Sequence, residues 1–243
     1  MKLDITNRSS EIEIMDDFHL EGEELKDSLN KIAKINQFLG GNKVTLNGLK
    51  NLLEKSSQKQ IITIVDIGCG NGDMLRAVAD FGIKNNYNFN LIGIDANEFT
   101  VEYAKSLSTK YSNINYQSEN VFEQHFETIK YDIVLCTLTL HHFADDEIYK
   151  LLTIFHKNAS LGLIINDLHR SKLAYRLFQL VCFVFQLNHL SKSDGLTSIL
   201  RGFKKEELER YSEKMKFKKY SINWKWAFRY QWIIRTTTSE LGS

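Results

Sequence analysis

The sequence predicts an α/β protein with a doubly wound, mostly parallel sheet, and two observations support that fold class. From residue 61 onward, short apolar runs rich in β-branched residues alternate with segments of helical periodicity. Strands that alternate with helices of about 10 to 15 residues are typical of parallel βαβ units. The chain has 243 residues, of which 43% are hydrophobic and 12% aromatic, which suits one large domain with a real core.

The elements of this sheet can be assigned in order along the chain. Strands are expected at residues 61–68, 89–96, 114–122, 131–143 and 161–170. Helices between them are expected at residues 73–82, 97–111 and 145–159. The C-terminal third should contain a long apolar helix over 171–190, a loop and an amphipathic helix over 193–215, and two strands over 217–236. Because these two strands meet tightly near Ala227, they should pair antiparallel at the sheet edge.

Composition divides the chain into three parts. Residues 1–59 are polar and helical: apolar residues recur at helical spacing from Leu25 to Leu39, and Gly40–Gly41 ends the pattern. We expect an N-terminal helical cap over 1–59, a main domain over 60–236 with a helical lid insertion at 170–200 after the fifth strand, and a flexible tail over 237–243.

Charge and cysteine content exclude several classes of function. The formal net charge is +1, so there is no global basic field of the kind that binds nucleic acid. The N-terminus lacks the apolar core of a signal peptide, and no uncharged apolar run reaches the roughly 18 residues of a membrane-spanning helix. We expect a cytoplasmic protein without stable membrane insertion. Cys69, Cys136 and Cys182 are widely spaced, which argues against a disulfide framework and a zinc site.

The stretch "IVDIGCGNGD", residues 64–73, carries the strongest functional signal. Gly68, Gly70 and Gly72 follow the first strand and open a helix, so the backbone can approach a ligand and the helix offers free N–H groups. Asp95 ends the next strand, where a carboxylate can accept both hydroxyls of a ribose. Together these features predict a nucleoside-containing cofactor at the carboxyl edge of the sheet, rather than a glycine turn that serves packing alone.

Details of the loop narrow the choice of cofactor. The spacing is G-x-G-x-G, and Asp73 stands where the dinucleotide fingerprint has its third glycine. No G-K-[ST] follows, so the loop is not a P-loop either. Asp66, just before the glycines, would repel a pyrophosphate and would suit a cation such as the amino group of an amino acid.

The stretches "VDIGCGNG" and "LIGIDAN" resemble those of class I S-adenosylmethionine-dependent methyltransferases, and the resemblance extends from residue 61 to about 235. It implies a Rossmann-like seven-stranded sheet whose last strand is antiparallel, with the N-terminal helices and residues 14–18 closing over the cofactor. A plain solvated cap is the alternative for those helices. The resemblance also implies that the glycine loop passes under the methionine part of S-adenosyl-L-methionine.

The same resemblance assigns the remaining cofactor contacts. It implies that Asp66 holds the amino end, that Asp95 binds the ribose and that Ala96 packs on the adenine. The adenine amino group would meet Asn120, with the Val121 backbone beside it, although the family usually has aspartate there; an amide oxygen can still accept this bond. Thr137, with Leu138, would line the sulfonium pocket.

Several features bear on the methyl acceptor. DNA amino-methyltransferases carry [ND]-P-P-[YF] after strand four. This chain has no proline, so the motif of that class is excluded. "LHHF" at 140–143 resembles quinone and polyketide methyltransferases, and "NDLHRSKLAYRLFQLV" and "SDGLTSILRGFKKEEL" are similar to a bacterial set of small-molecule enzymes. We therefore expect a small, apolar aromatic acceptor, a phenol or quinol, with O-methylation ahead of C-methylation. A macromolecular methyltransferase and a non-catalytic cofactor-binding scaffold are the alternatives.

The apolar helix over 172–187 lies where this class places substrate lids. Tyr175 and Phe178, together with Val181, Cys182 and Phe185, would wall an acceptor pocket. Core packing, a homodimer interface in place of a monomer, and peripheral membrane contact are other interpretations of the same apolar surface.

Methylation of a phenol requires removal of its proton, and histidine is the usual base near neutral pH. The candidates are His141, His142 and His169. His142 lies above the expected methyl position and His169 follows strand five, and these two are favoured as the base. Arg170 could hold an acidic or phenolate oxygen. Packing, helix capping and catalysis by proximity alone are the alternatives. A metal-dependent catechol mechanism would want an acid at the end of strand four and an acid–amide pair after strand five. Asn166 and Asp167 suit the second requirement, but Thr137 occupies the first position, so no metal is expected.

Overall fold

The structure is a computed structural model that describes residues 3–54, 60–123 and 125–236. Its seven strands form one sheet of order β3-β2-β1-β4-β5-β7-β6. β7 runs antiparallel to both of its neighbours, and the other pairs are parallel. The predicted fold class is therefore confirmed. The strands are β1 Ile61–Ile67, β2 Asn88–Asp95, β3 Ile114–Ser118, β4 Tyr131–Thr137, β5 Ala159–Leu168, β6 Tyr220–Lys225 and β7 Arg229–Arg235.

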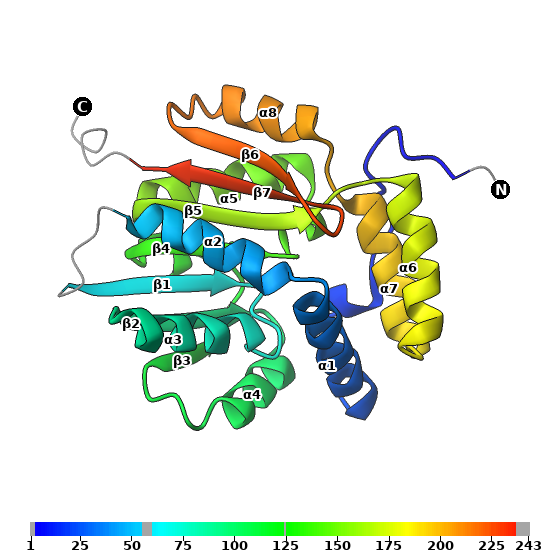
Figure 1. The fold of residues 1–243 in the computed structure, drawn as a ribbon, viewed down its shortest axis with the longest axis horizontal. Coiled ribbons are helices and arrows are strands. Elements are labelled where there is room, and N and C mark those ends of the chain that lie inside the picture. Colours follow the sequence, from blue (N-terminus) through cyan, green and yellow to red (C-terminus); the bar gives the residue numbers. More distant parts are fainter. Residues whose placement is uncertain (1–2, 55–59, 124, 237–243) are drawn as a thin grey trace.

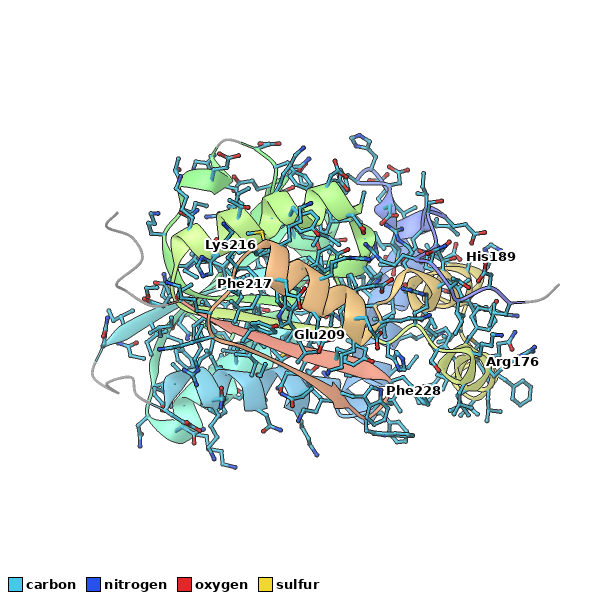
Figure 2. All side chains as sticks on the ribbon, turned by 90° about the horizontal axis from the view of Figure 1, so that it is seen from above. Arg176, His189, Glu209, Lys216, Phe217 and Phe228 are labelled. Atoms are coloured by element: carbon cyan, nitrogen blue, oxygen red, sulfur yellow. The ribbon has the colours of Figure 1, made fainter. Side chains whose placement is uncertain are left out.

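Helices cover both faces of the sheet and enclose two apolar cores. One core joins the sheet to α2 (Gly41–Leu53), α3 (Asp73–Asn85) and α4 (Glu98–Leu107). The other joins it to α5 (Asp145–Asn158) and α8 (Lys205–Lys214). Figure 2 shows α8 lying over the β6–β7 hairpin, with Phe217 before β6 and Phe228 at the hairpin turn. Phe217 packs on the buried Trp232 of β7, which anchors the antiparallel edge.

A third group of helices gathers at the end of the sheet to which the arrows of β1 and β5 point (Figure 1). These are α1 (Glu23–Phe38), α6 (Lys172–Val184) and α7 (His189–Arg201), with the short 3-10 helix η1 (Ile14–Asp16) beside α7. The carboxyl ends of parallel strands meet at one edge, so this group covers the loops that the sequence analysis singled out. Among the helices of the described residues, none combines the length and apolar character needed to cross a membrane.

The apolar segment predicted as one helix over 171–190 is two helices. α6 ends at Val184, Gln186 has a positive φ of 48°, and α7 begins at His189. The Asn188 side chain accepts a hydrogen bond from the Ser191 N–H at 2.8 Å and caps α7. The single-helix prediction was wrong because the break is made by this asparagine cap, with no glycine or proline to mark it. The expected tail, 237–243, lies outside the described residues.

Candidate cofactor and acceptor site

A cavity of about 970 Å³ lies at the carboxyl edge of the sheet, beneath α1, α6 and α7. Its lining combines the glycine loop and the ends of β2 and β4 with side chains of η1 and of the three covering helices. Small-molecule sites commonly measure about 300–1,000 Å³, so the cavity is large enough for a nucleoside cofactor and a second small molecule.

The glycine loop needs glycine at each of its three positions. Gly68, Gly70 and Gly72 have φ angles of 64°, 52° and 76°, a region that side chains rarely adopt. A Cβ atom at Gly68 would overlap Thr139, and one at Gly72 would overlap the Tyr116 hydroxyl. Gly70 instead faces the cavity, so its backbone is open to a ligand.

Asp95 ties the glycine loop to the end of β2 and lines the cavity. Its two carboxylate oxygens accept the Gly70 N–H at 3.0 Å and the Asn97 N–H at 3.1 Å. Burial raises the pKa of this carboxyl. Since each carboxylate oxygen can accept two hydrogen bonds, Asp95 keeps acceptor capacity for the ribose hydroxyls that the sequence analysis assigned to it.

Asp66 is 2% exposed, and its Oδ1 has no hydrogen-bond partner among the described residues. Burial, and then the charges of Asp73 and Asp95, raise the pKa of this carboxyl well above its ordinary value. A buried polar atom without a partner is costly. The ammonium group of a ligand in the cavity would supply the missing partner, so the site fits the amino end of S-adenosylmethionine.

The predicted adenine and sulfonium contacts also line the cavity. Ala96, Asn120, Val121 and Thr137 are all in its wall. The Asn120 Oδ1 accepts the Phe122 N–H at 3.0 Å, so the amide oxygen expected to meet the adenine is already shared with a turn. The Thr137 hydroxyl lies 3.1 Å from the hydroxyl of Thr45 on α2.

Two adjacent histidines end the loop after β4, and carboxylates hold each of them. The His141 Nδ1 lies 2.6 Å from Asp167 Oδ1, and the His142 Nδ1 lies 2.6 Å from Asp16 Oδ1. Burial acts to raise the pKa of Asp167, but the charge and hydrogen bond of His141 hold it below its ordinary value. His141 is 2% exposed and its Nε2 has no hydrogen-bond partner in the described part of the chain.

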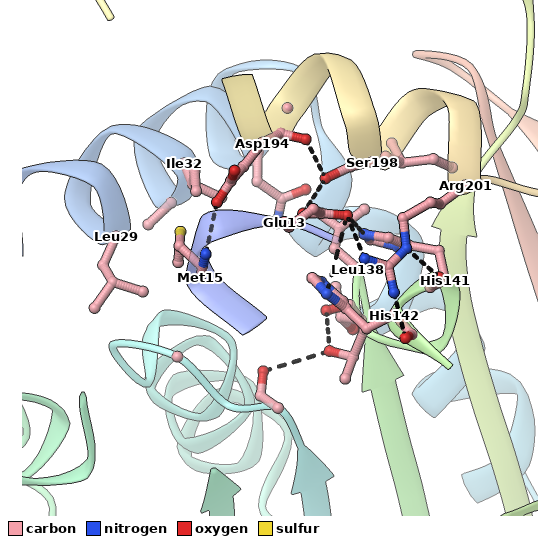
Figure 3. Close-up of a pocket in the computed structure, with 18 of the residues that line it drawn as sticks. Glu13, Met15, Leu29, Ile32, Leu138, His141, His142, Asp194, Ser198 and Arg201 are labelled. Atoms are coloured by element: carbon pink, nitrogen blue, oxygen red, sulfur yellow. Dashed lines mark hydrogen bonds and ion pairs between the residues drawn. The ribbon is translucent and has the colours of Figure 1, made fainter. Parts of the chain in front are cut away.

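Glu13, from the N-terminal segment, faces both histidines (Figure 3). Its Oε2 accepts the Ser198 hydroxyl at 2.7 Å, whereas its Oε1 has no hydrogen bond within the described residues. Burial raises the pKa of Glu13 to about 7. Arg201 donates to Asp16 at 2.6 Å and to the backbone carbonyls of both histidines, which fixes their loop. Sequence reasoning missed Glu13, because nothing in a polar N-terminal stretch marks one of its acids.

Of the predicted substrate and catalytic residues, His142 and Phe178 line the cavity, and His169, Arg170 and Tyr175 are not among its lining residues. His169 accepts the Trp224 indole N–H at 3.2 Å and packs on aromatic side chains of the β6–β7 hairpin. Arg170 is 1% exposed and forms an ion pair of 2.6 Å with Glu207. The expectation that Arg170 holds an acceptor oxygen therefore has no support in the geometry.

Comparison with known proteins adds a family match. The model of a family described as "Methyltransferase domain" matches residues 58–223. A ubiquinone biosynthesis O-methyltransferase of Rickettsia akari (strain Hartford) is 30% identical over 120 residues, 48% of this chain and 44% of the relative. The putative methyltransferase 235L of Invertebrate iridescent virus 6 is 27% identical over 147 residues, 60% of this chain and 47% of that protein. The chain thus spans about half the length of the curated relatives it matches.

Solved structures share the fold at low identity. The plantazolicin methyltransferase BpumL in complex with SAH superposes with a TM-score of 0.65 at 16% identity, covering 87% of this chain and 90% of that one. Magnesium protoporphyrin IX methyltransferase from Synechocystis PCC 6803 with bound SAM gives a TM-score of 0.55 at 13% identity, over 92% and 89% of the two chains.

Proposed function

We propose that this chain, which belongs to the methyltransferase-domain family, transfers a methyl group from S-adenosylmethionine to an oxygen of a small apolar aromatic acceptor. The family match confirms the class of enzyme that the sequence predicted, and S-adenosylmethionine is the cofactor of that class. The observation that carries the finer proposal is a single cavity in which the glycine loop meets the Glu13–His141–His142 cluster under apolar helices.

The cofactor is proposed to lie along the glycine loop. Asp66 would bind its ammonium group, Asp95 its ribose hydroxyls and the Gly70 backbone would lie against its methionine part, with Ala96 beside the adenine. Asp66 Oδ1, which has no hydrogen-bond partner among the described residues, supports this orientation, because an ammonium group at the end of the cavity nearest β1 would donate to it.

The acceptor is proposed to be apolar because of what covers the rest of the cavity. Leu29 and Ile32 of α1, Phe178 and Val181 of α6, and Ile199 of α7 line it. Apolar walls with a few convergent polar groups are typical of sites for small organic molecules. The name of the curated Rickettsia relatives, ubiquinone biosynthesis O-methyltransferase, supports transfer to oxygen rather than to carbon.

Methyl transfer from a sulfonium is an in-line displacement. The acceptor hydroxyl loses its proton, its oxygen lone pair forms the new C–O bond, and the C–S bond breaks with its electrons going to sulfur. Within the cluster, His142 is the proposed proton acceptor: Asp16 holds its Nδ1 at 2.6 Å, which leaves Nε2 for the acceptor. Orientation of the two reactants in the cavity supplies the rest of the rate enhancement.

A product analysis tests this function. The purified chain is incubated with methyl-labelled S-adenosylmethionine and a panel of phenols and quinols, beside a bacterial lysate depleted of small molecules. The proposal expects label in the organic extract, in methyl ethers identified by mass spectrometry. Label found only in RNA or protein would overturn it in favour of a macromolecular acceptor, and cofactor binding without any turnover would favour a scaffold.

A further inference from the structure

We infer that Glu13, His141 and His142 form a binding site for one divalent transition-metal ion, best suited to Zn²⁺, at the acceptor end of the cavity. The ligand atoms of the three residues all lie within 4.8 Å of one another. Neutral imidazole nitrogens and a carboxylate oxygen are the donors of His₂Glu zinc sites. The cysteine spacing and the residues at the strand ends predicted no metal site, whereas Glu13 comes from the N-terminal segment.

The first argument is two buried atoms that face each other without a partner. Glu13 Oε1 and His141 Nε2 lie 3.7 Å apart, and neither has a hydrogen bond within the described residues. This separation is too long for a hydrogen bond. Two ligands held about 2.0–2.2 Å from one tetrahedral ion lie about 3.4 Å apart. His142 Nδ1 is 3.9 Å from the same Glu13 oxygen, so both separations from Glu13 suit a common ion after small movements.

The second argument is how the ligands are oriented. Asp167 accepts from His141 Nδ1 at 2.6 Å, which leaves the Nε2 lone pair directed at Glu13. A carboxylate on the far nitrogen of a histidine is the usual support of a metal-bound imidazole. Ser198 holds the other oxygen of Glu13 at 2.7 Å. Figure 3 shows the side chain of Glu13, just before η1, and those of His141 and His142, in the loop after β4, converging beneath α7.

The third argument is charge. Three carboxylates, Glu13, Asp16 and Asp167, surround the two histidines, and Arg201 faces them with its Nη1 3.6 Å from Glu13 Oε1. Arg201 already donates to Asp16 and to backbone carbonyls. With neutral imidazoles and all three carboxyl groups ionised, a divalent cation would balance the two negative charges that Arg201 leaves. Binding exchanges the His142–Asp16 hydrogen bond for a metal–nitrogen bond, while Asp16 keeps Arg201.

The role of this site rests on the proposed function, whereas its metal binding does not. A His₂Glu site leaves a coordination position open, and all three residues line the cavity. An acceptor hydroxyl bound there would become more acidic and release its proton to water. The resulting oxygen would then attack the methyl carbon as the C–S bond breaks, so the cation would replace His142 as the group that activates the acceptor.

Metal titration tests the site directly. The full chain, freed of metal by EDTA dialysis, is titrated with Co²⁺ while visible absorption is followed, and Zn²⁺ is then added to displace it. We expect one equivalent of Co²⁺ with a visible band that Zn²⁺ removes. Glu13→Gln and His141→Gln should weaken binding by about tenfold or more, whereas His189→Ala, at the exposed start of α7 (Figure 2), should leave it unchanged.

Absence of a saturable band, or equal affinity in wild type and Glu13→Gln, would overturn the site. Asp167→Asn provides a second variant: it should weaken Co²⁺ binding by about 10- to 100-fold as a supporting residue, with S-adenosylhomocysteine binding as the check that the protein is folded. Methyl transfer measured before and after chelation separates the proposals. Transfer that survives chelation overturns the metal's role alone, and Co²⁺ binding without transfer to any phenol or quinol overturns the proposed function alone.

Discussion

His141 and Asp167 lie side by side in the interior, with Nδ1 2.6 Å from Oδ1 and each side chain 2% exposed. The other oxygen of Asp167 accepts the backbone N–H of His141 at 3.1 Å. One carboxylate at the end of β5 therefore fixes both the ring and the backbone of the loop after β4. The polar end of the cavity is rigid for this reason, and Glu13 closes it from the N-terminal side.

Asp95→Ala should weaken binding of S-adenosylhomocysteine by about 100-fold or more. The variant loses two charge-assisted bonds to a ribose and also releases the Gly70 N–H, and hydrogen bonds to charged groups are each worth about 1.5–3 kcal/mol. Calorimetric titration measures the change. Asp146→Ala, which removes an exposed aspartate of α5, is the matched control, and equal affinities in the two variants would contradict the assignment.

Cofactor binding should release protons as Asp66 ionises. Burial raises the pKa of Asp66 well above its ordinary value, so this carboxyl stays protonated to a higher pH in the free protein than an ordinary aspartate does. The ammonium group of the cofactor favours the carboxylate and lowers that pKa, so affinity should rise with pH until it exceeds the pKa of the free protein. Calorimetry in buffers of different ionisation enthalpy measures the released protons. Asp66→Asn should abolish the proton release. An unchanged release in that variant would contradict the assignment of Asp66 to the ammonium group.

Gly72→Ala should destabilise the protein more than Gly40→Ala does. The two glycines have nearly the same backbone, φ 76° and ψ 15° against φ 79° and ψ 16°, so the strain of about 1–2 kcal/mol for a left-handed alanine is shared. A Cβ at Gly72 also overlaps Tyr116, whereas one at Gly40 meets nothing within 4 Å. Urea denaturation gives both free energies of unfolding. Equal losses of stability would show that the Tyr116 side chain moves aside without a free-energy penalty.

Arg170→Met should lower stability without changing the KM for the acceptor. Arg170 and Glu207 form a buried ion pair away from the cavity lining, and removal of one partner of such a pair costs about 3–5 kcal/mol. Thermal denaturation measures the loss. Lys205→Ala, which breaks the exposed pair with Glu209, should change stability by less than about 1 kcal/mol. A raised KM in Arg170→Met with unchanged stability would restore its predicted role at the substrate.

The sequence predicted the sheet and the cofactor edge well because their signals are local. The apolar run of β1, the three glycines and Asp95 lie within one stretch of the chain. Each of these features has one dominant structural explanation that can be recognised from its neighbours in sequence. The acceptor end depends on long-range contacts instead. Glu13 meets Ser198 of α7, and the β6–β7 hairpin covers His169 through Trp224, so neither the extra acid nor the displaced histidine could be read from neighbouring residues.

The orientations of the two adjacent histidines could not be predicted from the sequence either. The sequence placed His141 and His142 in one loop but favoured only His142 for chemistry. In the structure His141 is turned inward to Asp167 and His142 is 26% exposed and turned to Asp16. Which of two adjacent side chains faces inward depends on the backbone of the loop, where Leu138 has a φ of 55°, and no local pattern specifies that.

A crystal structure with S-adenosylhomocysteine and the best phenol or quinol of the acceptor panel tests the central claim most directly. The account predicts the cofactor ammonium on Asp66, its ribose on Asp95, and the acceptor oxygen at the Glu13–His141–His142 cluster. An acceptor oxygen bound on the far side of the cavity, or a cofactor that leaves Asp66 without a partner, would contradict the account.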